Sequence, residues 1–238
     1  MRTLTIDGTN IVDKYHATYA GSDDDGAPER DSEEIDIPGR NGTIAVDKGR
    51  WKNKQVNYYC FMDKSVKEDL QSFRCFLLSL KGKIVRLEDS DKSNEYRMGR
   101  VSDSFDPARD IGYSTASFKI TVSCHPYRRL VSGDEIFNIS TSGSEIDNPS
   151  CFDAYPLITV YGTGPGTVTV GSVTLNIISL TDYLKIDCEE MNVYRETAEN
   201  KNNCVSLGEY PSIPEGKSKV TFTGGITSVD IMPRWWML

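Results

Sequence analysis

Few side chains in this 238-residue chain could carry out acid–base or nucleophilic chemistry. Its two histidines are His16 and His125, and Cys124 directly precedes His125. Cys124 and His125 stand at the end of a strand-like run, where successive side chains point to opposite faces, so they form a poor nucleophilic pair. We expect His16 to be a surface or hydrogen-bonded polar residue. The sequence contains neither a Gly-x-Ser-x-Gly elbow nor a His-Glu-x-x-His motif.

Two further patterns suggest chemistry, and each has a simpler structural explanation. Glu189 and Glu190 could serve as glycosidase carboxylates, but such carboxylates lie about 5 to 10 Å apart across a sugar. Adjacent acids at a strand end fit a solvated acidic surface better. Gly162, Gly164 and Gly166 could suggest a phosphate loop, but no Gly-Lys-Ser/Thr follows and the next segment has strand composition. We expect a hairpin there, and no enzymatic activity.

Metal ligands are also sparse. Tyr19 to Glu34 is rich in aspartate and glycine, but placing Gly26 at the glycine of a calcium loop puts Gly21 and Ser32 at carboxylate positions. We therefore predict a mobile acidic loop with no metal, and no cofactor in the chain. The cysteines occur singly, which favours small buried residues over structural zinc. They are Cys60, Cys75, Cys124, Cys151, Cys188 and Cys204.

The net charge of −8 is unevenly divided along the chain. Residues 1–130 hold 21 Lys and Arg against 21 Asp and Glu, whereas residues 131–238 hold 6 against 14. Neither part supplies the basic face that phosphate neutralisation needs, so we expect no sequence-specific nucleic-acid binding. No run approaches the ~18 apolar residues of a membrane span. Met1–Asp7 does not resemble a signal peptide, so we expect assembly in a reducing cytoplasm and no membrane insertion.

Residues 1–130 predict a β-domain with one packed helix. Ser65 and Glu68 form a capping box, and apolar residues then recur at three- and four-residue steps as far as Lys81-Gly82. This spacing predicts a helix over about residues 65–81. Alternating or aromatic runs predict strands at residues 2–6, 55–61, 83–88, 95–101 and 117–124.

Residues 131–238 predict a second, all-β domain. Val131 to Asn148 is rich in Ser, Thr, Gly and Asp, and we interpret it as a linker or crossover. Short strand-like runs with glycine turns then recur, which indicates a β-sandwich. These runs are residues 157–161, 167–170, 173–177, 183–186 and 219–222. The fold class predicted for the whole chain is mainly β, with domains at 1–130 and 131–238.

Two segments are candidates for interfaces. Pro38-Gly39 and Asn41-Gly42 are turn-forming pairs within Ile35–Gly42, and they flank the guanidinium of Arg40. We hypothesise that Arg40 makes charge-assisted contacts at this corner or at a subunit boundary. The chain ends with Arg234, Trp235, Trp236, Met237 and Leu238. Such an end leaves an apolar patch exposed unless it docks on its own domain or on a neighbouring subunit, and both alternatives stay open.

Several of these features together resemble the distal tail (Dit) proteins of siphophages that infect Gram-positive bacteria. The resemblance covers nearly the whole chain. It rests on the corner Ile35–Gly42, the strand after it, the helix at about 65–81, Pro126-Tyr127 and Pro233-Arg234-Trp235. Gly208–Gly216 is also similar to the family's Pro-x-Leu-x-Pro-Gly turn, with Ile213 and Glu215 as departures.

The resemblance implies a virion structural protein at the tail tip of a phage or prophage. Its N-terminal β-domain would assemble into a hexameric ring, and its C-terminal domain would be a galectin-like or carbohydrate-module-like sandwich. The ring would be the hub joining the tail tube to the baseplate. Its partners would be copies of itself, a tail-tube protein, a tail-associated (Tal-like) baseplate protein and a receptor-binding protein. The predicted interface residues are Pro38, Gly39, Arg40, Asn41, Gly42, Arg234, Trp235 and Trp236.

Two other functions remain as alternatives. The sandwich could be a carbohydrate-binding module for host cell-wall glycan, in which Tyr183, Tyr194 or Trp235 stacks on a sugar. A cell-wall hydrolase is the second alternative, and the shortage of catalytic groups disfavours it.

Overall fold

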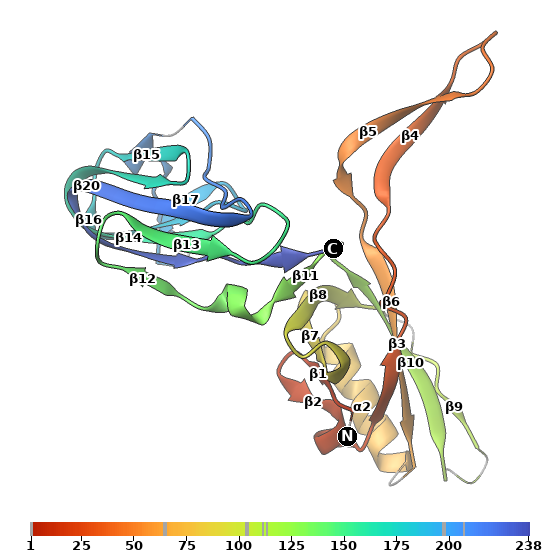
Figure 1. Cartoon of the computed structure of the whole chain (residues 1–238). Helices are drawn as coiled ribbons and strands as arrows, with labels where there is room; N and C mark the ends of the chain where they lie inside the picture. The colour runs from red at the N-terminus through yellow and green to blue at the C-terminus, as the bar shows by residue number, and fades with distance from the viewer. Residues whose placement is uncertain are drawn as a thin grey trace. The chain divides into compact units, whose positions relative to one another are not determined.

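The structure is a computed structural model that describes residues 2–63, 66–102, 105–110, 112, 114–196, 199–206 and 208–238. The chain divides into two compact units, one of Met1–Arg128 with Leu238 and the other of Arg129–Met237. Antiparallel strands dominate both units (Figure 1). The longest helix in the described ranges is α2 (Val66–Ser79). The mainly β fold predicted from the sequence is confirmed.

The first unit is built on an antiparallel sheet with the strand order β2-β1-β7-β8-β10-β6-β3. All five strands predicted in this region are present, and β7 and β8 pair with each other. The strands of this sheet are β1 (Leu4–Ile6), β2 (Thr9–Asn10), β3 (Thr18–Ser22), β6 (Lys54–Met62), β7 (Val85–Asp89), β8 (Glu95–Val101), β10 (Ala116–Cys124) and, beside β10, the short β9 (Ala108–Arg109).

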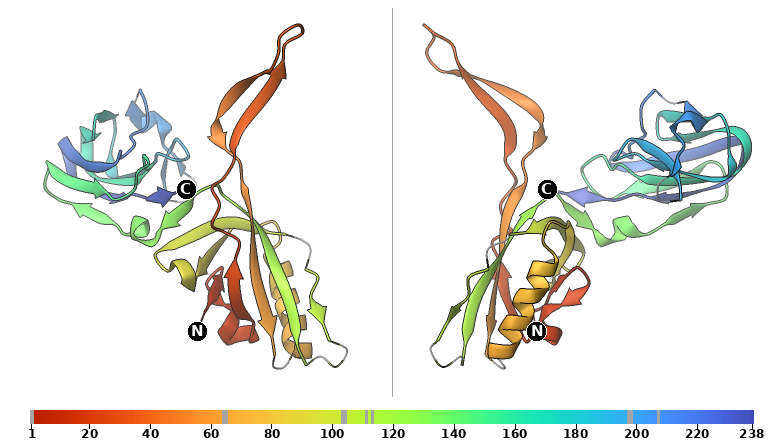
Figure 2. Two further views of the ribbon diagram at one scale, coloured as in Figure 1. Left: turned by 45° about the vertical axis from the view of Figure 1, so that its right-hand side comes forward. Right: turned by 180° about the vertical axis from the view of Figure 1, so that it is seen from behind.

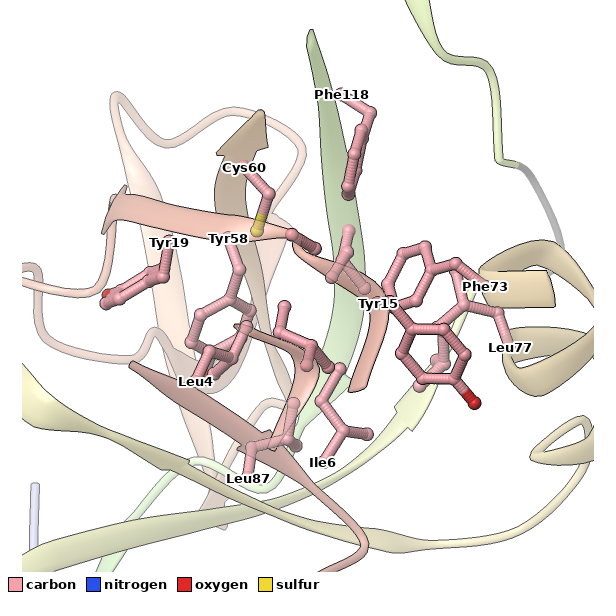
Figure 3. Packing of buried hydrophobic residues seen from close by; sticks show 14 of the residues in the cluster. Leu4, Ile6, Tyr15, Tyr19, Tyr58, Cys60, Phe73, Leu77, Leu87 and Phe118 are labelled. Carbon is pink, nitrogen blue, oxygen red and sulfur yellow. The ribbon is translucent and has the colours of Figure 1, made fainter. Parts of the chain in front are cut away.

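Helix α2 packs its apolar side on this sheet. Phe73 and Leu77 are buried and lie four residues apart, on the same side of the helix. The ring of Phe73 lies 5.3 Å from that of Tyr15 in the short helix α1 (Ile11–Tyr15) and 5.4 Å from that of Phe118 in β10 (Figure 3). The predicted helix is confirmed, and Ser65 of the expected capping box lies outside the described residues.

The prediction of a mobile loop from Tyr19 to Glu34 is wrong. Strand β3 pairs with β6, and the side chain of Tyr19 is buried in the core. Strand β4 (Arg30–Asp36) pairs along β5 (Thr43–Trp51). The acidic composition concealed these elements because several of the carboxylates, including Asp24 and Asp31, are paired with Lys and Arg from elsewhere in the unit.

The second unit is a β-sandwich in which two long strands, β14 (Leu157–Val170) and β20 (Gly216–Met232), run through both layers. One layer has the order β12-β20-β14-β16-β17-β18. In the other layer β13 pairs with β20, β15 pairs with β14, and β19 pairs with β15. The remaining strands of the sandwich are β12 (Phe137–Ile139), β13 (Ser144–Asn148), β15 (Val173–Ile177), β16 (Thr181–Asp187), β17 (Asn192–Arg195), β18 (Glu199–Asn200) and β19 (Val205–Ser206). Two short strands outside this sheet, β11 (Arg128–Leu130) and β21 (Trp236–Met237), pair with each other.

Two predictions for the second unit are wrong. Val131 to Asn148, predicted to be a linker or crossover, is not a linker but part of the sandwich, because β12 and β13 within it both pair with β20. Gly162 and Gly166 do not form a hairpin but lie inside β14, where its register with β20 shifts. A Cβ atom on Gly162 would lie 2.1 Å from the carbonyl oxygen of Gly225 on β20. Glycine is needed there for two backbones to approach, and not for a turn.

Candidate assembly surface

Strands β4 and β5 form a two-stranded hairpin, here called the arm (Arg30–Trp51), which projects from the sheet of the first unit (Figures 1 and 2). Its register places Asp36 opposite Thr43 near the tip and Arg30 opposite Trp51 near the root. An isolated two-stranded hairpin is marginally stable in water. A surface that covered the arm would therefore stabilise it.

The predicted corner forms the tip of the arm. The backbone N–H of Arg40 donates to the carbonyl of Ile37 at 3.1 Å, which closes a turn with Pro38 and Gly39 at its centre. Gly39 has a φ of +81°, as the third residue of a type II turn requires. The predicted interface residues Pro38 to Gly42 are all exposed. The Arg40 side chain forms no hydrogen bond or ion pair with any described residue.

One face of the arm carries exposed apolar side chains, beside Glu33, which lies opposite Val46. Ile35 lies directly opposite Ile44, and Val46 follows Ile44 by two residues and so shares its face. These three side chains are 46%, 37% and 44% exposed. The opposite face carries shorter or polar groups such as Glu34 and Ala45. An exposed apolar face on a strand pair with free edges marks a surface for protein association.

Several charged residues of the arm pair with one another. Arg50 Nε lies 2.7 Å from Asp31 Oδ2, and Arg30 Nε lies 2.8 Å from Asp47 Oδ2. The hydrogen bond from Arg50 holds the pKa of Asp31 below its usual value. Such exposed pairs add little stability. Their effect is to compensate charge along the arm.

The root of the arm is fixed by a buried ion-pair cluster around Asp24. Lys54, just beyond β5, donates to Asp24 at 2.9 Å, and Arg97 of β8 donates to both Asp24 oxygens at 2.7 and 2.8 Å. Arg128 also pairs with Asp24, and with Asp89 at 3.0 Å. Burial raises the pKa of Asp24, but the bonds from Arg97 and Lys54 outweigh burial and hold the pKa below its usual value. Nothing in the sequence spacing indicated this cluster.

The first unit exposes a second apolar patch on β6. Tyr59 and Phe61 are 46% and 41% exposed, while their neighbours Tyr58 and Cys60 point into the core. Phe61 lies opposite Ser117 of β10 in the sheet register. The outer face of this sheet therefore offers two aromatic side chains outside the arm.

The C-terminal residues predicted for an interface make contacts inside the second unit. Trp235 is 1% exposed and belongs to the sandwich core. Arg234 donates to both oxygens of Asp187 at 2.8 Å. The ring of Trp236 stacks on Phe152 with centroids 4.5 Å apart. The structure thus places Trp235 in the core of its own sandwich, and Arg234 and Trp236 have partners in the same unit.

His16, Cys124 and Glu189, which the sequence offered as candidates for chemistry, lie in environments that do not favour catalysis. His16 Nδ1 lies 2.7 Å from Asp69. Burial raises the pKa of Cys124 to about 12, which disfavours the thiolate that nucleophilic attack needs. Glu189 pairs with Arg129 at 2.6 Å, so the acidic surface predicted at Glu189 is partly neutralised.

In the described ranges, no group of three or more His, Cys, Asp or Glu side chains could hold a metal ion. None of the helices there is long and apolar enough to span a membrane. All six cysteines are unpaired thiols. The prediction that they are buried is wrong for Cys75 and Cys151, which are exposed.

Comparison with known proteins gives matches among solved structures alone. No family model matches the chain, and no curated protein matches it. The SPP1 Dit protein, described as a paradigm of the hub adsorption apparatus in phages infecting Gram-positive bacteria, matches with a TM-score of 0.75 and 11% identity over 100% of both chains. A chain of the phage P2 baseplate in its activated conformation with Ca matches with a TM-score of 0.50 and 13% identity over 97% of both chains. The chain therefore has the fold of the phage Dit protein, as its sequence resemblance predicted.

Proposed function

We propose that this chain is a structural protein of a phage or prophage tail tip, with no enzymatic step. The observation that supports this most strongly is the match to the SPP1 Dit protein over the full length of both chains. In this role the protein is the hub that joins the tail tube to a tail-associated (Tal-like) baseplate protein and a receptor-binding protein. It assembles in the host cytoplasm and ends in the virion.

The proposed hub is a ring of six copies in which the arm of each copy packs on the next. A closed ring uses head-to-tail contacts, so two different patches of one subunit must fit each other. The first unit offers two such patches, the Ile35–Ile44–Val46 face of the arm and the Tyr59–Phe61 patch on β6. Residues 1–130 carry no net charge, so packed copies do not repel one another.

The tip of the arm adds a charged group, the guanidinium of Arg40, to the same contact between copies. Arg40 has no intrachain partner among described residues, and its exposed guanidinium can pair with a carboxylate of the next copy. Pro38, Gly39, Asn41 and Gly42 hold the turn that presents it. The proposed interface therefore keeps the five predicted tip residues, while the Arg234–Trp236 segment serves its own sandwich.

Adding one charge to the apolar face of the arm is expected to abolish ring assembly. Ile44→Asp would bury an unpaired carboxylate at each subunit contact, at a cost of at least about 2 kcal/mol per contact. The matched control is Ala45→Asp, which adds the same charge to the opposite face of the same strand. Sedimentation velocity of the purified chains should show a ring for the wild type and Ala45→Asp, and monomers for Ile44→Asp.

Two results of that comparison would count against the arm as the ring contact. One is an Ile44→Asp protein that assembles to the wild-type size. The other is an Ala45→Asp protein that dissociates as completely as Ile44→Asp, which would show an effect of charge alone.

A further inference from the structure

The outer face of the β12-β20-β14-β16-β17-β18 layer carries a polar groove. Lys185 pairs in register with Tyr194, Asp187 with Asn192, and Tyr194 with Asn200. Residues in register point to the same face of a sheet. Ile186 and Val193, which alternate with them, are buried in the core. The paired polar side chains therefore face away from the core.

These side chains line a groove with a volume of about 450 Å³. Lys185, Asn192 and Tyr194 form no side-chain hydrogen bond or ion pair with any residue in the described ranges. Asp187 also lines the groove, and both of its carboxylate oxygens accept hydrogen bonds from Arg234. The groove thus presents an ammonium group, an amide and a phenol ring whose hydrogen-bonding capacity is unused within the chain.

The charge of the groove limits what it can hold. Glu190 and Glu196 add two carboxylates to the lining, and Lys185 supplies one positive charge. With Asp187 neutralised by Arg234, the lining is net negative, which repels sulfated or phosphorylated polymers. Amide groups that both donate and accept match sugar hydroxyl groups, which do the same. The Tyr194 ring adds an apolar surface for the C–H face of a sugar ring.

We propose that this groove binds a neutral oligosaccharide, with Tyr194 as the stacking platform and Lys185, Asn192 and Asn200 as hydrogen-bonding groups. Among the aromatic residues considered from the sequence, Trp235 is buried. Tyr183 donates to Glu196 at 2.7 Å and lies beneath Arg195. Of Tyr183, Tyr194 and Trp235, only Tyr194 lines the groove. The inference is independent of ring assembly, because all of these residues belong to the second unit.

The test is isothermal titration calorimetry of the full-length protein. The neutral probes are maltotetraose, mannotetraose and the tetramer of N-acetylglucosamine, and the charged probes are dextran sulfate and tetralysine. At least one neutral probe should bind with a Kd of about 1 mM or tighter. Tyr194→Ala and Asn192→Ala should each weaken that binding by about tenfold. Tyr155→Ala should not, since Tyr155 is an exposed tyrosine of the same unit outside the groove.

Three results would overturn the proposal. The first is that no neutral probe binds at concentrations up to about 10 mM, tenfold above the expected Kd. The second is that only dextran sulfate or tetralysine binds. The third is that Tyr155→Ala weakens binding as much as Tyr194→Ala. Circular dichroism of Tyr194→Ala checks its fold, and Asn192→Ala provides the same test at a polar, partly exposed position.

Discussion

Replacing Asp24 by asparagine is expected to lower the free energy of unfolding of the first unit by about 3 to 5 kcal/mol. The substitution leaves Arg97 and Arg128 buried without the carboxylate that both contact, and it removes the partner of Lys54 at the root of the arm. Urea denaturation combined with hydrogen exchange at the β6 and β10 amides would measure the loss. Asp25→Asn is the matched control, because the Asp25 side chain is 93% exposed.

The same cluster predicts how stability depends on pH. The folded pKa of Asp24 is lowered from 3.8, so the ionised form is favoured by folding. Its contribution is complete above the unfolded pKa, near pH 4, and is lost as the pH falls through the lower folded value. The Asp24→Asn protein should lack this acid-sensitive component. A change below about 0.5 kcal/mol, equal to that of Asp25→Asn, would contradict a stabilising role for the cluster.

The second large effect is expected at Trp235. Trp235→Ala should destabilise the second unit by about 3 to 5 kcal/mol, because it removes a large side chain from the sandwich core and leaves a cavity. The backbone nitrogen of Trp235 would lie only 2.4 Å from a Cβ atom at Gly133. The backbones of Gly133 and Trp235 are therefore in close contact, and they cannot easily move to fill the cavity. Urea denaturation followed by circular dichroism would measure the change.

The neighbouring tryptophan supplies the control. Trp236 is only partly buried, and its ring stacks on Phe152 near the surface. Trp236→Ala should therefore cost less than Trp235→Ala. Equal losses for the two variants, or a larger loss for Trp236→Ala, would contradict the core position assigned to Trp235.

Regular elements with a clear periodicity were predictable from the sequence. The spacing of apolar residues such as Phe73 and Leu77 predicts α2, and the alternation in residues 117–124 predicts β10. Both patterns arise because each element buries one face, so its apolar residues recur with the period of a helix or a strand. Pro38-Gly39 gave the turn at the arm tip, since that pair suits the centre of a type II turn.

The missed elements are those in which long-range contacts override local composition. Strand β4 is acidic along most of its length, and its partner β5 rather than its own sequence makes it a strand. The local sequence around Asp24 predicts a loop, because the residues that pair with its carboxylate, Arg97 and Arg128, lie 73 and 104 residues away in the chain. The sequence around Gly162 and Gly166 predicts a turn, because it does not reveal how closely the paired backbones of β14 and β20 approach there.

The candidate sites divide in the same way. The tip residues Pro38 to Gly42 could be selected from sequence because turn chemistry is local. The apolar face of the arm could not, because Ile35 and Ile44 become neighbours only through the register of β4 with β5. Likewise, the sequence near Trp235 does not reveal that this side chain is buried, because the residues around it come from distant strands of its own sandwich.

In the proposed assembly the arm joins copies of this chain into a closed ring, which native mass spectrometry of the purified full-length protein can detect. The expected particle has six times the 26.6 kDa mass of the chain, and it is lost in the Ile44→Asp protein. A wild-type protein that stays monomeric at every accessible concentration, or a hexamer that Ile44→Asp leaves intact, would contradict this assembly.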